Sequence, residues 1–323
     1  MNNVKIKIIE YIKKHGRVSV NQLSNNFDLS RQMIHRHLID LIHKGIIDKI
    51  GTPPKVFYFI KKEKVAENEI DIDNKTKETI EKNYLIITSS GERKSGVEGF
   101  IYWCDKNKLP IEKTAQKYVE TLKKYKKFKK NELINGTVKI KSTFKEVALK
   151  YLFYLDFYSI ERFGKTKLGQ LLLYAKQSQN KKLMKELIDV IRPQVVQIII
   201  KYKIDGIGFI PPTVKRETQF MKILENYLKL QVKTLKISKI KTGIVVPQKT
   251  LNKLDDRIDN AKKTIVVEDC FQYNNVLLID DAVGSGATLN ETAAQIKQNK
   301  IAKNVIGLAI TGSFKGFDVI SEV

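Results

Sequence analysis

The stretch that decides the fold is VLLIDDAVGSGATL, residues 276–289. It opens with four apolar residues, 276–279, and a run of this kind predicts a strand buried on both faces. Two adjacent carboxylates, Asp280 and Asp281, follow the run, and a loop of small residues, 284–288, comes next. A helical pattern follows the loop. Open α/β sheets bind ligands where such a strand passes through a loop into a helix.

The loop predicts a phosphate site. Residues 284–288 have little side-chain bulk, so their backbone N–H groups can converge on an anion, and the helix that follows adds a favourable dipole. Ser285 and Thr288 can donate hydroxyl hydrogen bonds to the same phosphate. Asp280 and Asp281 can accept charge-assisted hydrogen bonds from the vicinal hydroxyls of a ribose. The stretch therefore predicts a site for a phosphorylated sugar.

Other interpretations of a glycine-rich loop fit less well. A P-loop requires Gly-Lys-Ser/Thr after the loop, which is absent here. A dinucleotide fingerprint places its acid about twenty residues after the loop, whereas Asp280 and Asp281 precede it. A plain strand–turn–helix with a chance acidic pair is the remaining alternative. The agreement of strand, acids, loop and helix argues against it.

The segment resembles the fingerprint of the type I phosphoribosyltransferases, in which two acids and a Thr-Gly-Ala-Thr loop bind 5-phosphoribosyl-1-pyrophosphate (PRPP). Ser285 stands where the commonest loop has Thr, and a hydroxyl is kept. The resemblance implies that the two acids hold the ribose and that the loop holds the 5′-phosphate. The implied PRPP-binding residues are Asp280, Asp281, Ala282, Gly284, Ser285, Gly286, Ala287 and Thr288.

Two further stretches resemble the competence protein F (ComF) branch of that family, and the similarity spans about 150 to 312. The first is FIPPTVKRETQFMKILENYL. The second is KIKTGIVVPQKTLNKLDDRIDNA, with Gln248, Arg257 and Asn260 in matching places. There are two departures. Residues 216–219 replace the family's Arg-Gly-Phe-Asn, and the cysteine-rich zinc segment usual in that branch is missing.

The resemblance implies a reaction in which a nitrogen nucleophile displaces pyrophosphate from C1 of PRPP. Mg²⁺ carried by PRPP would neutralise the leaving group. Lys215 and Arg216 would contact pyrophosphate, and Arg257 and Lys241 would close over it. No protein-held metal is expected. The candidate catalytic residues are Asp280, Asp281, Lys215, Arg216 and Arg257.

The first sixty residues resemble a winged helix-turn-helix domain. Apolar spacing predicts three helices, the first ended by Gly16, the second capped by Asn21 and the third capped by Ser30 and ended by Gly45. A strand-like step at residues 18–20 follows the first helix. Two strands with a Pro-rich tip complete the pattern, at Ile46–Ile50 and Val56–Ile60.

In such domains the third helix lies in the major groove of duplex DNA, and its N-terminal side chains meet the bases. Lys55 at the wing tip would meet phosphate. A winged helix used for protein contact is the alternative. His35 and His37 lie two residues apart and point away from each other on a helix, which argues against a metal site. The candidate DNA-binding residues are Arg31, Gln32, His35, Arg36 and Lys55.

Composition sets the outer limits. A chain of 323 residues is long enough for two or three domains, and its formal charge of +24 suits polyanionic partners. Of the 59 basic residues, eight are Arg and 51 are Lys, which an AT-rich coding sequence also produces. The absence of an apolar run of about 18 residues and of a signal-peptide core predicts a cytoplasmic protein without membrane contact. The two cysteines predict neither a disulfide framework nor a zinc site.

We expect four parts: a winged helix at residues 1–62, a charged linker at 63–83, a Lys-rich α+β middle region at 84–135 and a phosphoribosyltransferase-like domain at 136–323. In the last part strands alternate with helices, which predicts an α/β fold with a mostly parallel sheet. The architecture is similar to that of the purine operon repressors, which bind PRPP without using it. A PRPP-responsive transcriptional regulator, acting as a homodimer on DNA, is therefore expected. The alternatives are an active phosphoribosyltransferase and a ComF-like DNA-handling protein.

Overall fold

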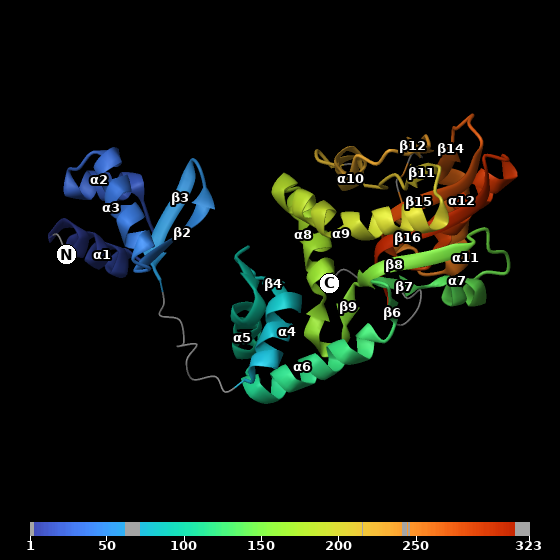
Figure 1. The fold of residues 1–323 in the computed structure, drawn as a ribbon. Helices are drawn as coiled ribbons and strands as arrows, with labels where there is room; N and C mark the ends of the chain where they lie inside the picture. Colours follow the sequence, from blue (N-terminus) through green and yellow to red (C-terminus); the bar gives the residue numbers. More distant parts are fainter. Residues whose placement is uncertain (1–2, 62–71, 215, 241–243, 245, 314–323) are drawn as a thin grey trace. The chain divides into compact units, whose positions relative to one another are not determined.

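The computed structural model describes residues 3–61, 72–214, 216–240, 244 and 246–313. The chain divides into two compact units, Met1–Ile70 and Asp71–Val323 (Figure 1). Each unit has its own apolar core. Within the described residues, no helix combines the length and the apolar character that a membrane span needs.

The first unit has three helices and a three-stranded antiparallel sheet in the order β1-β3-β2. Its core consists of apolar side chains from all three helices packed against the sheet, including Ile8, Leu23, Leu38 and Tyr58. The helices are α1 (Asn3–His15), α2 (Val20–Phe27) and α3 (Arg31–His43), and the strands are β1 (Val18–Ser19), β2 (Ile47–Thr52) and β3 (Lys55–Ile60). These are the elements of a winged helix-turn-helix.

Local hydrogen bonds set the ends of these helices. Ser30 caps α3, as predicted, and accepts the backbone N–H of Met33. The cap of α2 is Ser19 rather than Asn21, since Ser19 and Gln22 form a reciprocal capping box. The hairpin is also tighter than expected: pairing continues to Thr52 and Lys55, and only two prolines form its tip.

The second unit is built on a seven-stranded sheet in the order β12-β11-β15-β16-β8-β7-β6. The first five strands in this order run parallel, and β7 and β6 add antiparallel pairs at one edge. The strands are β6 (Lys129–Lys130), β7 (Leu133–Asn135), β8 (Tyr151–Phe157), β11 (Gly206–Phe209), β12 (Lys233–Thr234), β15 (Tyr273–Val283) and β16 (Ala302–Gly312).

Helices cover both faces of this sheet. On one face, α8, α9 and α10 pack in one cluster with side chains such as Leu277, Ile279 and Leu308. The alternate residues of β15, Val276 and Leu278, are buried outside that cluster, where α12 contacts β15 and β16. The helices are α7 (Thr137–Thr143), α8 (Lys167–Ser178), α9 (Lys181–Tyr202), α10 (Phe220–Leu228), α11 (Leu254–Thr264) and α12 (Ala287–Gln298).

The stretch assigned to a linker is partly folded. Helix α4 (Asn74–Asn83) is capped by Asp73 and buries Ile80 against α5 and α6, so residues 74–83 are part of the second unit. Likewise, β6 and β7 bring the end of the Lys-rich middle region into the large sheet. No boundary therefore falls at residue 135 or 136. The remaining elements here are β4 (Leu85–Ile87), β5 (Arg93–Ser95), α5 (Gly96–Lys106) and α6 (Ile111–Lys126).

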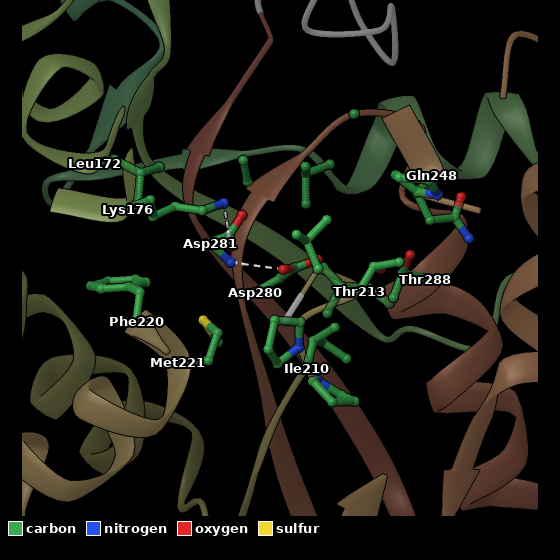
Figure 2. Close-up of a pocket in the computed structure, with 18 of the residues that line it drawn as sticks. Leu172, Lys176, Ile210, Thr213, Phe220, Met221, Gln248, Asp280, Asp281 and Thr288 are labelled. Atoms are coloured by element: carbon green, nitrogen blue, oxygen red, sulfur yellow. Dashed lines mark hydrogen bonds and ion pairs between the residues drawn. The ribbon is translucent and has the colours of Figure 1, made fainter. Parts of the chain in front are cut away.

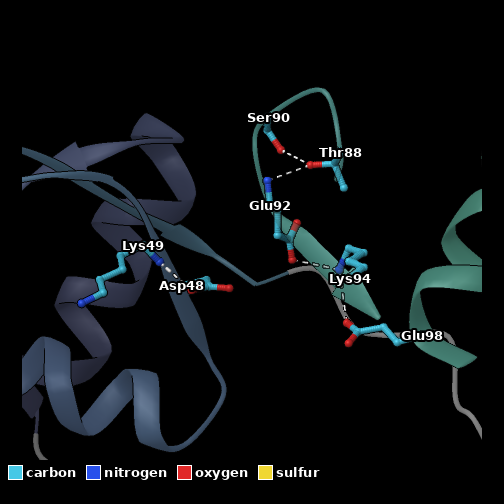
Figure 3. A network of polar contacts seen from close by, with 7 residues as sticks. All are labelled: Asp48, Lys49, Thr88, Ser90, Glu92, Lys94 and Glu98. Atoms are coloured by element: carbon cyan, nitrogen blue, oxygen red, sulfur yellow. Dashed lines mark hydrogen bonds and ion pairs between the residues drawn. The ribbon is translucent and has the colours of Figure 1, made fainter. Parts of the chain in front are cut away.

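The β4–β5 hairpin is held by polar contacts as well as by pairing. Figure 3 shows Lys94 between two carboxylates, with its Nζ 2.8 Å from Glu92 and 3.2 Å from Glu98. The hydroxyls of Thr88 and Ser90 are 2.8 Å apart, and the former accepts the backbone N–H of Glu92. The hydrogen bond to Thr88 gives the backbone N–H of Glu92 an acceptor within the turn, and Lys94 pairs with two carboxylates beside it.

Two expected strands lie outside the main sheet. Strands β13 (Ile237–Lys239) and β14 (Ile265–Val267) pair antiparallel with each other as a two-stranded sheet. They therefore do not extend the main sheet, which stays mostly parallel as expected. Short apolar runs predict strands but not their partners. Two other short strands, β9 (Ser159–Ile160) and β10 (Gly164–Lys165), also pair only with each other, and 3-10 turns occupy Glu161–Phe163 and Gln248–Thr250.

We expect Leu277→Ala to lower the free energy of unfolding of the second unit by about 2–5 kcal/mol. Leu277 is fully buried in the central strand of the sheet, so its truncation leaves a cavity that the packed helices cannot fill. Val138→Ala is the control, because Val138 is 76% exposed and its truncation should change stability by less than about 0.5 kcal/mol. Urea unfolding followed by circular dichroism measures both changes, and equal effects would contradict the assignment of this core.

Candidate ligand site and winged-helix surface

The candidate site lies where the strand order of the sheet reverses. From β11 the chain proceeds outward to β12, and from the adjacent strand β15 it proceeds outward to β16 on the other side. The loops that follow β11 and β15 therefore diverge and leave a crevice at the carboxyl ends of these strands. Such switch points are where open α/β sheets bind ligands.

A cavity of about 280 Å³ occupies this crevice. It brings together Asp280, Asp281, Ala282, the whole loop 284–288, Arg216 and Arg257, so every described ligand or catalytic candidate from the sequence lines one space. In Figure 2 the two acids lie in the centre, Thr288 and Gln248 on one side, and Leu172, Phe220 and Met221 on the other. Lys215 and Lys241 lie outside the described residues.

The two acids point away from each other. Strand β15 continues through Val283, so both belong to the strand, and successive side chains of a strand project from opposite faces. Asp281 faces α8, where its Oδ2 accepts a charged hydrogen bond of 2.6 Å from Lys176 Nζ. Asp280 Oδ1 accepts the backbone N–H of Asp281 at 2.7 Å.

Burial, reinforced by repulsion from Asp281, raises the pKa of Asp280 to about 7. The positive charges of Lys176 and Lys239 oppose this shift without cancelling it. Lys239 donates from Nζ to Thr213 Oγ1 at 2.7 Å, and burial lowers its own pKa. The ionised form of Asp280 is therefore disfavoured unless a cation or a hydrogen-bond donor lies beside its carboxylate.

The phosphate-loop candidate is the N-terminus of α12. Gly286 is the N-cap residue with φ +83°, a left-handed conformation that disfavours other residues, and it has no side chain to cap the helix. Ser285 is buried, and its Oγ accepts the N–H of Ala287 at 3.3 Å. The first N–H groups of a helix have no acceptor within the helix, and this end of α12 lines the cavity.

Two arginines border the cavity from different elements. Arg216, after β11, donates from Nη1 to the backbone carbonyl of Lys176 at the end of α8. Arg257 is 5% exposed; its Nε donates to Leu251 O at 2.7 Å, while its Nη2 has no hydrogen-bond partner among the described residues. Gln248 donates to Arg257 O at 3.0 Å and to Asn260 Oδ1 at 3.1 Å. The three residues singled out by spacing therefore form one contact group.

Lys176 and Lys239 are functional candidates that the sequence analysis missed. The chain has 51 lysines; Lys176 lies in no motif, and Lys239 begins the second ComF-like stretch but was not singled out there. Lys176 is four residues after Leu172 on the cavity side of α8, but only the packing of α8 against β15 places it beside Asp281. The cations lining the cavity are Lys176, Arg216, Lys239 and Arg257, against two acids. The lining therefore has a formal excess of positive charge.

In the first unit, the candidate DNA-contacting side chains are all exposed. Ile34, Leu38 and Leu41 form the buried stripe of α3, and the predicted contact residues Arg31, Gln32, His35 and Arg36 lie off that stripe. Lys55 is exposed beside the tip of the β2–β3 hairpin. Ile39, not foreseen as a contact residue, is 53% exposed and continues the outward face formed by Gln32 and Arg36.

Residues 1–48 match the family model described as winged helix-turn-helix DNA-binding. No curated protein matches the sequence. Among solved structures, a hypoxanthine phosphoribosyltransferase from Staphylococcus aureus is similar at 14% identity with a TM-score of 0.26. The match covers 41% of this chain and 66% of that enzyme, just under two thirds of its length. A likeness this weak supports no argument about activity. The protein thus has an N-terminal winged helix-turn-helix domain, followed by an α/β unit with a cavity at its switch point.

We expect Asp280→Asn to stabilise the protein relative to wild type at about pH 8, with the difference shrinking toward about pH 4.5. In the unfolded chain the carboxyl has a pKa of about 3.9, and in the folded chain about 7. Between these values the folded state keeps a proton that the unfolded state has lost, so wild-type stability falls as pH rises. Asparagine does not titrate.

Urea unfolding of both proteins at several pH values measures this difference. Glu78→Gln, an exposed acid on α4, is the control and should follow the wild-type pH dependence. A difference between Asp280→Asn and wild type that stays constant over the whole range would show that Asp280 titrates like a solvated acid.

Proposed function

We propose that the α/β unit binds PRPP or a closely related ribose 5-phosphate compound, and that the winged helix binds duplex DNA in response. The observation that supports this most directly is the meeting of an acid pair and a glycine-rich helix N-terminus in one cavity. A 5′-phosphate would lie on residues 284–288, where backbone N–H groups and the Thr288 hydroxyl can donate to it. Asp280 and Asp281 would accept hydrogen bonds from the ribose hydroxyls.

The cations of the cavity favour PRPP over ribose 5-phosphate. A ribose hydroxyl that bonds to Asp281 competes with Lys176 for the same carboxylate. The pyrophosphate of PRPP adds negative charge near C1 that the cations of the cavity can pair with, and ribose 5-phosphate does not. Arg216 and the Nη2 of Arg257 are further donors for it.

Mg²⁺ would arrive with PRPP and lie mainly on its pyrophosphate. Among the described residues, no group of three or more His, Cys, Asp or Glu side chains could hold a metal ion. Mg²⁺ keeps most of its ligands from water and phosphate, so one carboxylate of the cavity would be enough to contact the ion that PRPP carries. The bound ion would neutralise charge on the pyrophosphate.

A ligand site joined to a DNA-binding domain suits a transcriptional regulator. PRPP changes the affinity for DNA only if it binds the DNA-free and the DNA-bound protein with different affinities. In that case DNA changes the affinity for PRPP by the same factor. The match of residues 1–48 to a DNA-binding family supports the DNA half of this proposal. The exposed basic and amide side chains at the start of α3 are suited to base edges.

An active phosphoribosyltransferase is the second candidate, and the apolar end of the cavity favours it. Leu172, Phe220 and Met221 line the space beside the acids, on the side away from Thr288, where a flat acceptor would fit. In that reaction a nitrogen lone pair of the acceptor bonds to C1 while the C1–O bond to pyrophosphate breaks. Release of pyrophosphate from PRPP with a panel of nucleobases distinguishes a transferase from a regulator.

We expect isothermal titration to show Mg²⁺-dependent PRPP binding that Asp281→Ala weakens by about 2 kcal/mol, the scale of a charged hydrogen bond. Ribose 5-phosphate should bind more weakly than PRPP. Glu268→Gln is a matched control, because Glu268 is an exposed acid outside the cavity that pairs only with Lys236 among the described residues. Equal PRPP affinity in wild type and in an Asp280→Ala, Asp281→Ala double variant would refute the site.

We expect Lys55→Ala to weaken binding to all duplex sequences alike, because Lys55 would contact only phosphate. The slope of log affinity against log salt concentration should become shallower by about one. Gln32→Ala should instead lower affinity for the preferred sequence by roughly 1–3 kcal/mol and relax its specificity, because Gln32 faces the bases. Gel-shift titrations with random DNA and with DNA upstream of the gene measure both effects.

Lys108→Ala, an exposed lysine outside the winged helix, is the control for the loss of one positive charge. No affinity for any duplex at low salt would leave the winged helix as a protein-contact domain. That result would remove the regulatory half of the proposal and leave PRPP binding untouched.

A further inference from the structure

Helix α9 has an outward seam that the other described residues leave exposed. Its inward side chains, among them Leu187, Ile191 and Ile198, are buried against the sheet. The outward residues recur at alternating steps of four and three, the spacing of a coiled-coil contact line. We call these exposed residues the α9 seam: Asp189, Pro193, Val196, Ile200 and Lys203, the last being the C-cap residue of the helix.

The middle of the α9 seam is apolar. Ile200 is 72% exposed and Val196 37% exposed, and Pro193 lies one turn before Val196. Val190, 47% exposed, flanks the same surface. A single exposed apolar side chain needs no explanation, but several on consecutive turns of one helix form a patch that suits a protein partner.

The ends of the α9 seam have opposite charges at equal distances from its centre. Asp189 lies seven residues before Val196, and Lys203 lies seven residues after it. Rotation of a second helix by half a turn about an axis beside Val196 places the partner's Lys203 level with Asp189. The same rotation sets Pro193 near the partner's Ile200. A surface with this property is complementary to its own reversed copy, which is the requirement for an isologous dimer.

We propose that the α9 seam is the interface of a homodimer, in which α9 packs antiparallel against α9 of a second copy. From Asp189 to Lys203 the contact line is about 21 Å long, at 1.5 Å per residue. The helix is rigidly presented, because Arg192 donates from both Nη atoms to the backbone carbonyls of Tyr227 and Leu228 and so ties α9 to α10. A preformed surface of this kind loses little conformational entropy on association.

A second copy fits this surface better than a different protein would. The charge pattern reverses sign about its own centre, so the partner that satisfies both ends is an identical helix in reverse. A two-fold dimer also provides two winged helices, as dimeric helix-turn-helix proteins do at paired half-sites. The proposal nevertheless depends on neither PRPP nor DNA binding.

Sedimentation velocity of the full chain over a range of concentrations tests the interface. We expect a dimer, and we expect Val196→Glu to raise its dissociation constant at least about tenfold, because two like charges would meet at the centre of the seam. Val138→Glu is the matched control, since Val138 is also exposed but lies on α7. Unchanged circular dichroism establishes that each variant is folded. A monomeric wild-type chain, or a dimer that Val196→Glu leaves intact, overturns the proposal.

A charge exchange tests the antiparallel pairing. Asp189→Lys and Lys203→Asp should each weaken the dimer, because each sets like charges against one another at both ends of the seam. The double variant, Asp189→Lys with Lys203→Asp, should recover wild-type self-association. Its mixture with wild type should form few mixed dimers. A double variant as weak as the single ones overturns this pairing.

Discussion

The structure of the second unit depends on the burial of β15. Its central residues are apolar on both faces, and the strand also exposes backbone donors and acceptors along both edges, so it must be covered by helices and paired on both sides. Strands β11 and β16 pair with its two edges. Helices α8 to α10 cover one face, and α12 covers the other. The chain must then leave β11 and β15 in opposite directions. The crevice between their ends is a consequence of that connectivity.

The elements that the sequence could predict are those with local signals. Periodic apolar residues predict α1, α2 and α3, and the cap at Ser30 follows from the preference of serine for helix N-termini. The loop at residues 284–288 is predicted for the same reason, because strand, glycines and helix are contiguous in the chain. The cap of α2 was misassigned because Ser19 and Asn21 are both good N-cap residues, and only the reciprocal bond to Gln22 distinguishes them.

Long-range contacts could not be predicted in this way. Residues 74–83 are rich in charge and were taken for a linker, yet Thr76 and Ile80 are buried and α4 contacts α5 and α6. Lys176 and Lys239 lie far from the acids in sequence, on a helix and on a strand whose positions depend on packing. The partly unsatisfied guanidinium of Arg257 is likewise visible only once the turn at Leu251 and the cavity wall are in place.

The register of β15 sets the direction in which each of the two acids projects. Asp281 shares a face with Leu277 and Ile279 and therefore meets Lys176 on α8, whereas Asp280 projects to the opposite face. A slip of one residue would exchange the two faces and turn Asp280, rather than Asp281, toward α8. The packing of Val276–Ile279 thus sets the direction in which both acids project. In this way the hydrophobic core orients the polar groups of the cavity.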